Sequence, residues 1–358
     1  MKFKSLAAAS FICCLLSVSF VFPASAAELT LMAVGDILPH ASWQKFEVPV
    51  SALMKGVTEK LYEADVLIGN LESPLTDFSE PTPNKSGQAI KAKKDFVFRS
   101  ALPDSAKGLK DCGFTVLTLA NNHMLDYQEQ GVVDTLDRLR GVGICTAGAG
   151  CEIYEAVKPA VVETKGRKII VLAASDVVPK GYEAEPGKPG IVSMKDADSL
   201  MSRVMDTREE HPGAIIVLSL HWGVEATLTP SMRQKELARH LIDCGADVIL
   251  GHHPHRIQGV ELYRGRPIFY SLGNFQFDSN SPGDESVIAK VVFSDGRLEP
   301  AKVSVLPVFI GKGGAPRVLG ARDPGRTAIL KKVDELSRPL GAQLKGDAVV
   351  PLPVSSYF

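Results

Sequence analysis

Residues 248–255 read VILGHHPH, an apolar run that leads directly into three histidines. A short run rich in β-branched residues and closed by glycine is typical of a buried β-strand. Neutral histidine is the commonest metal ligand among side chains. The stretch therefore predicts a buried strand whose end presents imidazoles to a metal ion. The alternative is a polar loop with incidental histidines.

Four other apolar runs end in the same manner, in side chains that can bind a metal. They lead into Asp36, Glu72, Asn122-His123 and His221. Ligands of α/β sheets bind beyond the carboxyl ends of the strands, so we expect the five strand ends to form one site. Oxygen and nitrogen ligands without thiolate suit Zn, Mn or Fe. The alternatives are plain structural roles: a turn former for Asp36, a cap for Glu72 and a core residue for His221.

The composition is that of an ordinary globular protein with a full core. The chain has 358 residues, 45% of them hydrophobic, and a formal net charge of −1. Nucleic-acid-binding surfaces normally show as a basic excess or a basic stripe. The charge balance gives no such sign, and we expect no nucleic-acid partner.

The N-terminus has the pattern of a secretory signal peptide over residues 1–26. Lys2 and Lys4 precede an apolar stretch at 6–22, and Ala24-Ser25-Ala26 offers a small-x-small cleavage site. The alternative is an uncleaved membrane anchor. We therefore expect an exported protein (periplasmic, cell-surface or secreted) whose mature part, 27–358, is a single domain with its core at about 29–310. In an exported chain, Cys145 and Cys151 could form a disulfide.

Strands alternate with helical patterns through most of the mature chain, as in α/β folds. Helices are predicted at residues 102–112, 132–140, 232–244 and 328–340. Further strands are predicted at residues 257–263, 267–272, 287–293 and 301–309. We expect these consecutive strands to be antiparallel and to pack against the first part of the sheet. Two long polar loops, 78–94 and 179–190, have the length of functional or disordered loops.

The ligand residues occur in the order used by calcineurin-like metallophosphoesterases. More closely, the chain resembles the CapA family of poly-γ-glutamate capsule biosynthesis proteins, a divergent branch of that superfamily. The resemblance runs from about Leu29 to Phe293 and includes ANNHMLDY at 120–127 and SLGNF at 271–275. It implies an α/β fold of four layers, an α/β/β/α sandwich of metallophosphoesterase type with metals at the strand ends.

The resemblance also implies two divalent transition-metal ions, Mn, Zn or Fe, and a residue set that holds them. One metal would be held by Asp36 and His255, the other by Asn122, His221 and His253, with Glu72 as the bridge. The phosphoesterases place a histidine two residues after the first aspartate. Here that position is Leu38, and His40 is expected to take the role. His252 and His253 can exchange roles, since both lie near His255.

Two functions are compatible with this site. The first is a metal-dependent hydrolase, in which two cations clamp the attacking and leaving oxygens and His123 is the general acid. The resemblance implies an anionic polymer (poly-γ-glutamate or another envelope polymer) or a phosphoester as substrate, and a capsule-synthesis membrane complex as partner. The second is a non-enzymatic accessory factor that binds or exports the polymer. Leu38 favours the accessory factor, whereas His123 favours the hydrolase.

Overall fold

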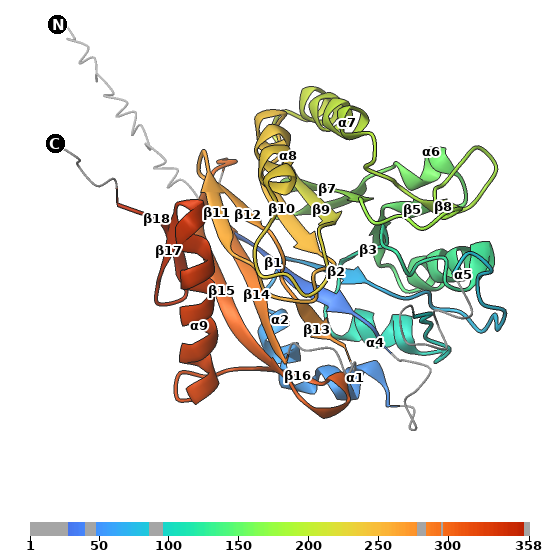
Figure 1. Ribbon diagram of the computed structural model, residues 1–358, viewed down its shortest axis with the longest axis horizontal. Coiled ribbons are helices and arrows are strands. Elements are labelled where there is room, and N and C mark those ends of the chain that lie inside the picture. Colours follow the sequence, from blue (N-terminus) through green and yellow to red (C-terminus); the bar gives the residue numbers. More distant parts are fainter. Residues whose placement is uncertain (1–27, 40–47, 86–95, 278–283, 295, 354–358) are drawn as a thin grey trace, which may run out of the picture.

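The computed structural model describes residues 28–39, 48–85, 96–277, 284–294 and 296–353. The predicted signal peptide and His40 lie outside the described residues. Within the described residues, two β-sheets lie between helices that cover their outer faces (Figure 1).

The first sheet contains ten strands among the described residues. They are β1 (Leu29–Ile37), β2 (Val66–Leu71), β3 (Val116–Thr118), β4 (Cys145–Ala147), β13 (Asn274–Gln276), β14 (Glu285–Phe293), β15 (Pro300–Ile310), β16 (Pro316–Val318), β17 (Ala342–Lys345) and β18 (Ala348–Pro351). Their order is β17-β18-β15-β14-β1-β2-β3-β4, with β13 beside β1 and β16 beside β15. Strands β1 to β4 are parallel, and β14 is antiparallel to β1. The carboxyl ends of β1, β2 and β3 therefore meet at one edge.

The second sheet contains six strands among the described residues. They are β6 (Ala160–Thr164), β7 (Arg167–Ser175), β9 (Ile215–His221), β10 (Val248–His252), β11 (Val260–Tyr263) and β12 (Arg266–Phe269). Their order is β11-β12-β10-β9-β7-β6, with β7, β9, β10 and β12 parallel. A separate pair is formed by β5 (Ala149–Gly150) and β8 (Gly190–Ile191). All five predicted strands that end in candidate ligands are confirmed: three lie in the first sheet and two in the second.

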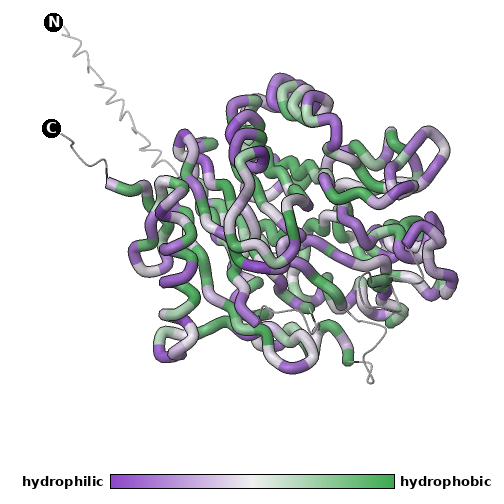
Figure 2. Tube along the Cα trace, in the orientation of Figure 1, coloured by the Kyte–Doolittle hydropathy of each residue, from purple (hydrophilic) through white to green (hydrophobic). Residues whose placement is uncertain are grey.

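Helices flank the sheets on both outer sides. The α-helices are α1 (Val50–Leu53), α2 (Thr58–Leu61), α4 (Ser105–Asp111), α5 (Gln128–Gly141), α6 (Ile153–Ala156), α7 (Ala197–Glu210), α8 (Met232–Asp243) and α9 (Pro324–Ser337). Short 3-10 turns are η1 (Met54–Gly56), η2 (Lys312–Gly314) and η3 (Arg338–Leu340). The longer helices alternate hydrophilic and hydrophobic residues along their length (Figure 2), as expected for helices with one buried face. The four predicted helices are confirmed as α4, α5, α8 and α9, with shifted ends.

The core consists of apolar clusters that separate the layers. Successive residues of β1 point to opposite faces, so Leu29, Leu31 and Ala33 pack between the two sheets. On the other face, Met32 and Val34 pack toward α1, α4 and α5. A third cluster lies between the second sheet and the helices α7 and α8. The expected four-layer α/β/β/α architecture is confirmed.

The prediction for the later strands was wrong in part. All four predicted segments contain strands, but the strands do not form one antiparallel unit. β14 and β15 are antiparallel and extend the first sheet, whereas β11 and β12 form a hairpin in the second sheet, where β12 is parallel to β10. A strand pattern in the sequence indicates which residues are buried. It does not indicate in which of the two sheets the strand lies.

Cys112, Cys145, Cys151 and Cys244 are free in the structure, so Cys145 and Cys151 are not paired. Within the described residues, no helix has both the length and the apolar character that crossing a membrane requires.

Candidate metal centre

The strand ends of both sheets meet at one buried site. In the first sheet, Asp36 on β1 is in register with Asn70 on β2. In the second, His221 on β9 is in register with His252 on β10. His252 Nδ1 donates to Asp36 Oδ1 at 3.1 Å, which joins the ends of the two sheets. The stacking of the sheets thus brings together side chains that are far apart in the sequence.

Asp36 is fully buried and accepts several hydrogen bonds. Besides His252, Asn70 Nδ2 donates to Oδ1 at 2.8 Å, and His255 Nδ1 lies 3.4 Å from Oδ2. Burial opposes ionisation of the carboxyl group, but the hydrogen bonds from His252 and His255 outweigh it and hold the pKa of Asp36 well below its usual value. Asp36 is therefore an ionised carboxylate held in a fixed orientation.

Glu72 is also fully buried, yet neither carboxylate oxygen has a hydrogen-bond partner among the described residues. Its Oε1 lies 3.6 Å from His221 Nε2 and 3.8 Å from His255 Nε2. Burial and the charge of Asp36 raise the pKa of Glu72 well above its usual value. A buried carboxylate without hydrogen bonds is costly unless a charge compensates it. The residue therefore fits a cation site.

Potential ligand atoms form two groups that share Glu72. The first group is Asp36, Glu72 and His255, and the second is Glu72, His221 and His253; within each, the ligand atoms lie within 4.8 Å of one another. Asn122 belongs with the second group, because its Oδ1 lies 2.7 Å from His221 Nε2. Glu72 is thus common to both groups, and the role of these residues as metal ligands stays a prediction.

The pKa values of the imidazoles at this site shift in two directions. Burial and neighbouring histidines lower the pKa of His221 well below its usual value and that of His253 to about 3. Metal ligands must be unprotonated, so both are ready to bind. For His255, burial opposes protonation, but the charges of Glu72 and Asp36 raise its pKa to about 10. The negative charge that favours a proton on His255 equally favours a metal cation.

The structure separates His252 from His253. His253 belongs to the ligand groups, whereas His252 lies against Asp36. The surroundings of position 38 are apolar. Leu38 is fully buried there in a small cluster with Phe98 and Phe277. With His40 outside the described residues, its expected role stays a prediction.

Replacing His221 with alanine is expected to lower metal affinity by at least the roughly 10–100-fold that loss of an outer-shell partner costs. The substitution removes one of the two imidazoles of the second group, so only that of His253 remains. Isothermal titration of metal-free protein with Zn²⁺ or Mn²⁺ measures the change. The matched control is His211→Ala, at the end of α7, which should bind like the wild type. Equal affinity in both variants would show that His221 is not a ligand.

His123 lies beside the centre and is held by residues to which sequence reasoning gave no role. Its Nδ1 donates to Asp126 Oδ2 at 2.7 Å, and the Phe98 ring stacks on the imidazole at 4.2 Å between centroids. Lys85 Nζ lies 2.7 Å from Asp126 Oδ1 and 3.2 Å from His123 Nδ1. Tyr182 donates its hydroxyl to Asp126 Oδ1 at 2.9 Å. Burial and the charge of Lys85 lower the pKa of His123.

The sequence did contain a signal for part of this arrangement. Asp126 follows His123 by three residues within the quoted motif, a spacing that places both side chains on one side of a turn. Lys85 and Tyr182 come from the two long polar loops, whose length already indicated a function.

Replacing Lys85 with methionine is expected to lower the free energy of unfolding by about 1–3 kcal/mol, the cost of leaving a buried polar group unsatisfied. The loss stays in this range because Asp126 keeps its bonds to Tyr182 and to the Phe98 amide. Urea denaturation measures it. The control is Lys107→Met, which removes the exposed ion pair to Asp111 and should leave stability unchanged. Unchanged stability in both variants would contradict the expected result.

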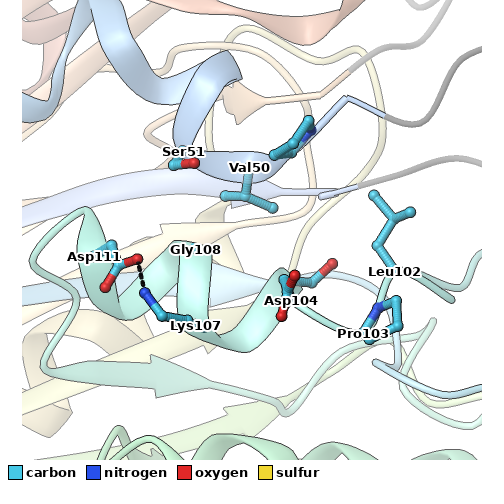
Figure 3. Close-up of a pocket in the computed structure, with 10 residues that line it drawn as sticks. Val50, Ser51, Leu102, Pro103, Asp104, Lys107, Gly108 and Asp111 are labelled. Carbon is cyan, nitrogen blue, oxygen red and sulfur yellow. Dashed lines mark hydrogen bonds and ion pairs between the residues drawn. The ribbon is translucent and has the colours of Figure 1, made fainter.

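A pocket of about 440 Å³ is lined by residues of α1 and α4 and of the segments before them (Figure 3). Its lining includes Ser51, Asp104 and Lys107, and none of the predicted site residues. Among the described residues, no group of three potential metal ligands includes a residue of this lining.

Two stacked sheets between helical layers, with a buried carboxylate and imidazole cluster at the strand ends, define an α/β/β/α sandwich protein with a candidate metal centre. The family described as bacterial capsule synthesis protein PGA_cap matches residues 30–279. This match covers more than half of the chain, so the protein belongs to that family, and the resemblance to CapA proteins is confirmed.

Two relatives are similar over most of the chain. The capsule biosynthesis protein CapA of Bacillus anthracis is 33% identical over 305 residues, which cover 84% of this chain and 72% of that protein. The PGA biosynthesis protein CapA of Bacillus subtilis (strain 168) is 34% identical over 253 residues, covering 70% and 63%. The chain thus spans less than two thirds of the B. subtilis protein.

Among solved structures, the chain is similar to a Staphylococcus aureus structure assigned as a 5'-nucleotidase, in complex with alpha-ketoglutarate. The TM-score is 0.47 and the sequence identity 14%, over 86% of this chain and 58% of that chain.

Proposed function

We propose that this member of the capsule synthesis family is a metal-dependent hydrolase that acts on an anionic envelope polymer or a phosphoester. The observation that carries the proposal is Glu72, a buried carboxylate without hydrogen-bond partners that belongs to both ligand groups. A structural role alone does not account for a buried carboxylate whose two oxygens both lack hydrogen-bond partners among the described residues. A pair of cations does.

The residues present fit two divalent cations. Asp36, Glu72 and His255 would hold one, and Glu72, Asn122, His221 and His253 the other. The donors are oxygen and nitrogen, as Mn, Zn or Fe prefer. When bound, the cations would stabilise negative charge on the substrate and make a water molecule more acidic.

The chain itself supplies a proton-transfer group. Asp126 accepts from Nδ1 of His123 and so fixes the tautomer in which Nε2 is free to exchange a proton. The Phe98 ring restrains the imidazole plane. Burial lowers the pKa of His123, and an anionic substrate beside it would raise the pKa again, because nearby negative charge favours the imidazolium. An anionic substrate would therefore favour the protonated form of His123, which a general acid requires.

A non-enzymatic accessory factor is the second candidate. Leu38 stands where phosphoesterases place a histidine, and its side chain is fully buried among phenylalanines. A site that lacks this ligand could bind a carboxylate-rich polymer through its cations without cleaving it. In either case we propose an exported protein that works with the capsule-synthesis machinery, on the basis of the N-terminal pattern and family membership.

A substrate screen tests the proposal. Metal-loaded protein is incubated with p-nitrophenyl phosphate, bis-p-nitrophenyl phosphate and poly-γ-glutamate, with His221→Ala as the control for contaminating hydrolases. Hydrolysis by the wild type that is lost in His221→Ala supports the hydrolase. Metal binding and polymer binding without hydrolysis would instead favour the accessory factor.

A further inference from the structure

The segment after β9 crosses the exposed side of the centre and carries Glu225. Its backbone is fixed at both ends to the histidine segment after β10. The Trp222 amide donates to the His252 carbonyl at 3.1 Å, and the Ala226 amide donates to the Pro254 carbonyl at 2.9 Å. Glu225 lies between these two hydrogen bonds. Its Cα therefore has a defined position relative to the histidines, although its side chain is exposed.

Side chains that pack below this segment also hold its backbone in place. The buried Trp222 donates its indole Nε1–H to the Tyr270 carbonyl at 3.0 Å. Gly223 has a φ of +91°, and a Cβ there would lie 2.8 Å from the Gln234 amide nitrogen. Gln234 is itself fixed in the capping box that begins α8 with Ser231. Glycine adopts this conformation without strain, whereas a side chain at position 223 would be strained and would crowd Gln234.

The side chain of Glu225 forms a third ligand group. Its carboxylate and the imidazoles of His253 and His255 have ligand atoms within 4.8 Å of one another. A second observation concerns His253, which is 5% exposed and whose Nδ1 has no hydrogen-bond partner among the described residues. His253 and His255 also adopt positive φ values of 93° and 53°, a strained backbone of the kind kept at functional sites.

We propose that Glu225 is a further ligand at the proposed centre, to one of the two divalent transition-metal ions that His253 and His255 would each help to hold. This inference rests on the proposed metal centre. Glu72 approaches the histidines from inside the protein, whereas Glu225 approaches them from solvent. Carboxylate and imidazole together form the mixed oxygen and nitrogen set that Zn, Mn and Fe accept. Glu225 is the exposed member of the set, and it closes the centre on its solvent side.

The test is cation binding by metal-free protein. Wild type, Glu225→Gln, Glu236→Gln and His253→Ala are titrated with Mn²⁺ or Zn²⁺ by calorimetry. Glu236 is an exposed glutamate on α8, so Glu236→Gln is the matched control for loss of one surface charge. We expect Glu225→Gln to weaken binding of one cation by about 10-fold or more, and Glu236→Gln to stay within about twofold of wild type. The visible spectrum of Co²⁺-loaded protein should also change in Glu225→Gln and stay that of the wild type in Glu236→Gln.

The outcomes separate this inference from the metal centre. If His253→Ala loses affinity while Glu225→Gln matches the wild type in affinity and Co²⁺ spectrum, Glu225 is not a ligand and the centre stands without it. If the wild type binds no divalent cation, both the centre and this inference are wrong. Because Glu225 is exposed, the variant should fold like the wild type, which its thermal unfolding without metal checks.

Discussion

Replacing Glu72 with glutamine is expected to remove most of the cation affinity while leaving the metal-free protein as stable as before or more stable. The carboxylate is buried, and its oxygens have no hydrogen-bond partners among the described residues. A neutral amide relieves the cost of that buried charge. The same change removes a ligand from both groups at once, because Glu72 is the residue they share. Cation affinity is thus expected to fall while the stability of the metal-free protein holds or rises. A general loss of structure would lower both.

Unfolding in urea, with and without Zn²⁺ or Mn²⁺, measures both effects. A cation at a thousand times its Kd stabilises a protein by about 4 kcal/mol, and Glu72→Gln should lose most of this gain. The control is Glu261→Gln on β11, also buried, where Tyr270 and Arg239 donate to the carboxylate at 2.7 and 2.8 Å. Glu261→Gln should lose stability yet keep the gain from metal. If Zn²⁺ or Mn²⁺ stabilised Glu72→Gln as much as the wild type, Glu72 would not be a ligand.

Replacing His123 with glutamine is expected to slow turnover by about 10²–10⁴-fold for substrates with poor leaving groups, the usual cost of losing a general acid. Metal binding should be unaffected, because His123 belongs to neither group that shares Glu72. Nitrophenyl leaving groups need little protonation, so the defect should shrink for nitrophenyl esters.

The deciding quantity is the ratio of mutant to wild-type kcat for a nitrophenyl ester and for an alkyl ester of the same phosphate. Metal content measured in the same samples controls for loss of the centre. Undiminished kcat on both esters would mean that His123 is not the acid. An equal, large loss on both would assign it to binding or to the fold.

The strands and most helices could be predicted because their signals are local. A parallel strand buried on both faces reads as a continuous apolar run, and β1, β2, β9 and β10 all show it. Helix ends were less accurate. Residues 102–104 lie before α4, although the glycine stop after that helix was correctly located.

The candidate ligands could also be predicted, because a polar side chain directly after a buried strand stands out in the sequence. Asp36, Glu72, Asn122, His221, His253 and His255 all meet at one site in the structure. Their assignment as ligands stays a prediction that the titrations above test. Lys85 and Glu225 had no such signal, since a single charged residue in a polar loop looks like any solvent-exposed residue.

The sequence alone determined which segments form strands and which side chains stand at their ends, because burial on one or both faces is recorded in neighbouring residues. Only the tertiary structure decided how those ends combine. Asp36 and His252 are 216 positions apart, and their contact exists because one sheet packs on the other. That stacking also decided that Glu72 is shared by two ligand groups and that His253 rather than His252 joins them. No local pattern encodes such distances, since they depend on how two sheets align when their apolar faces are buried against each other.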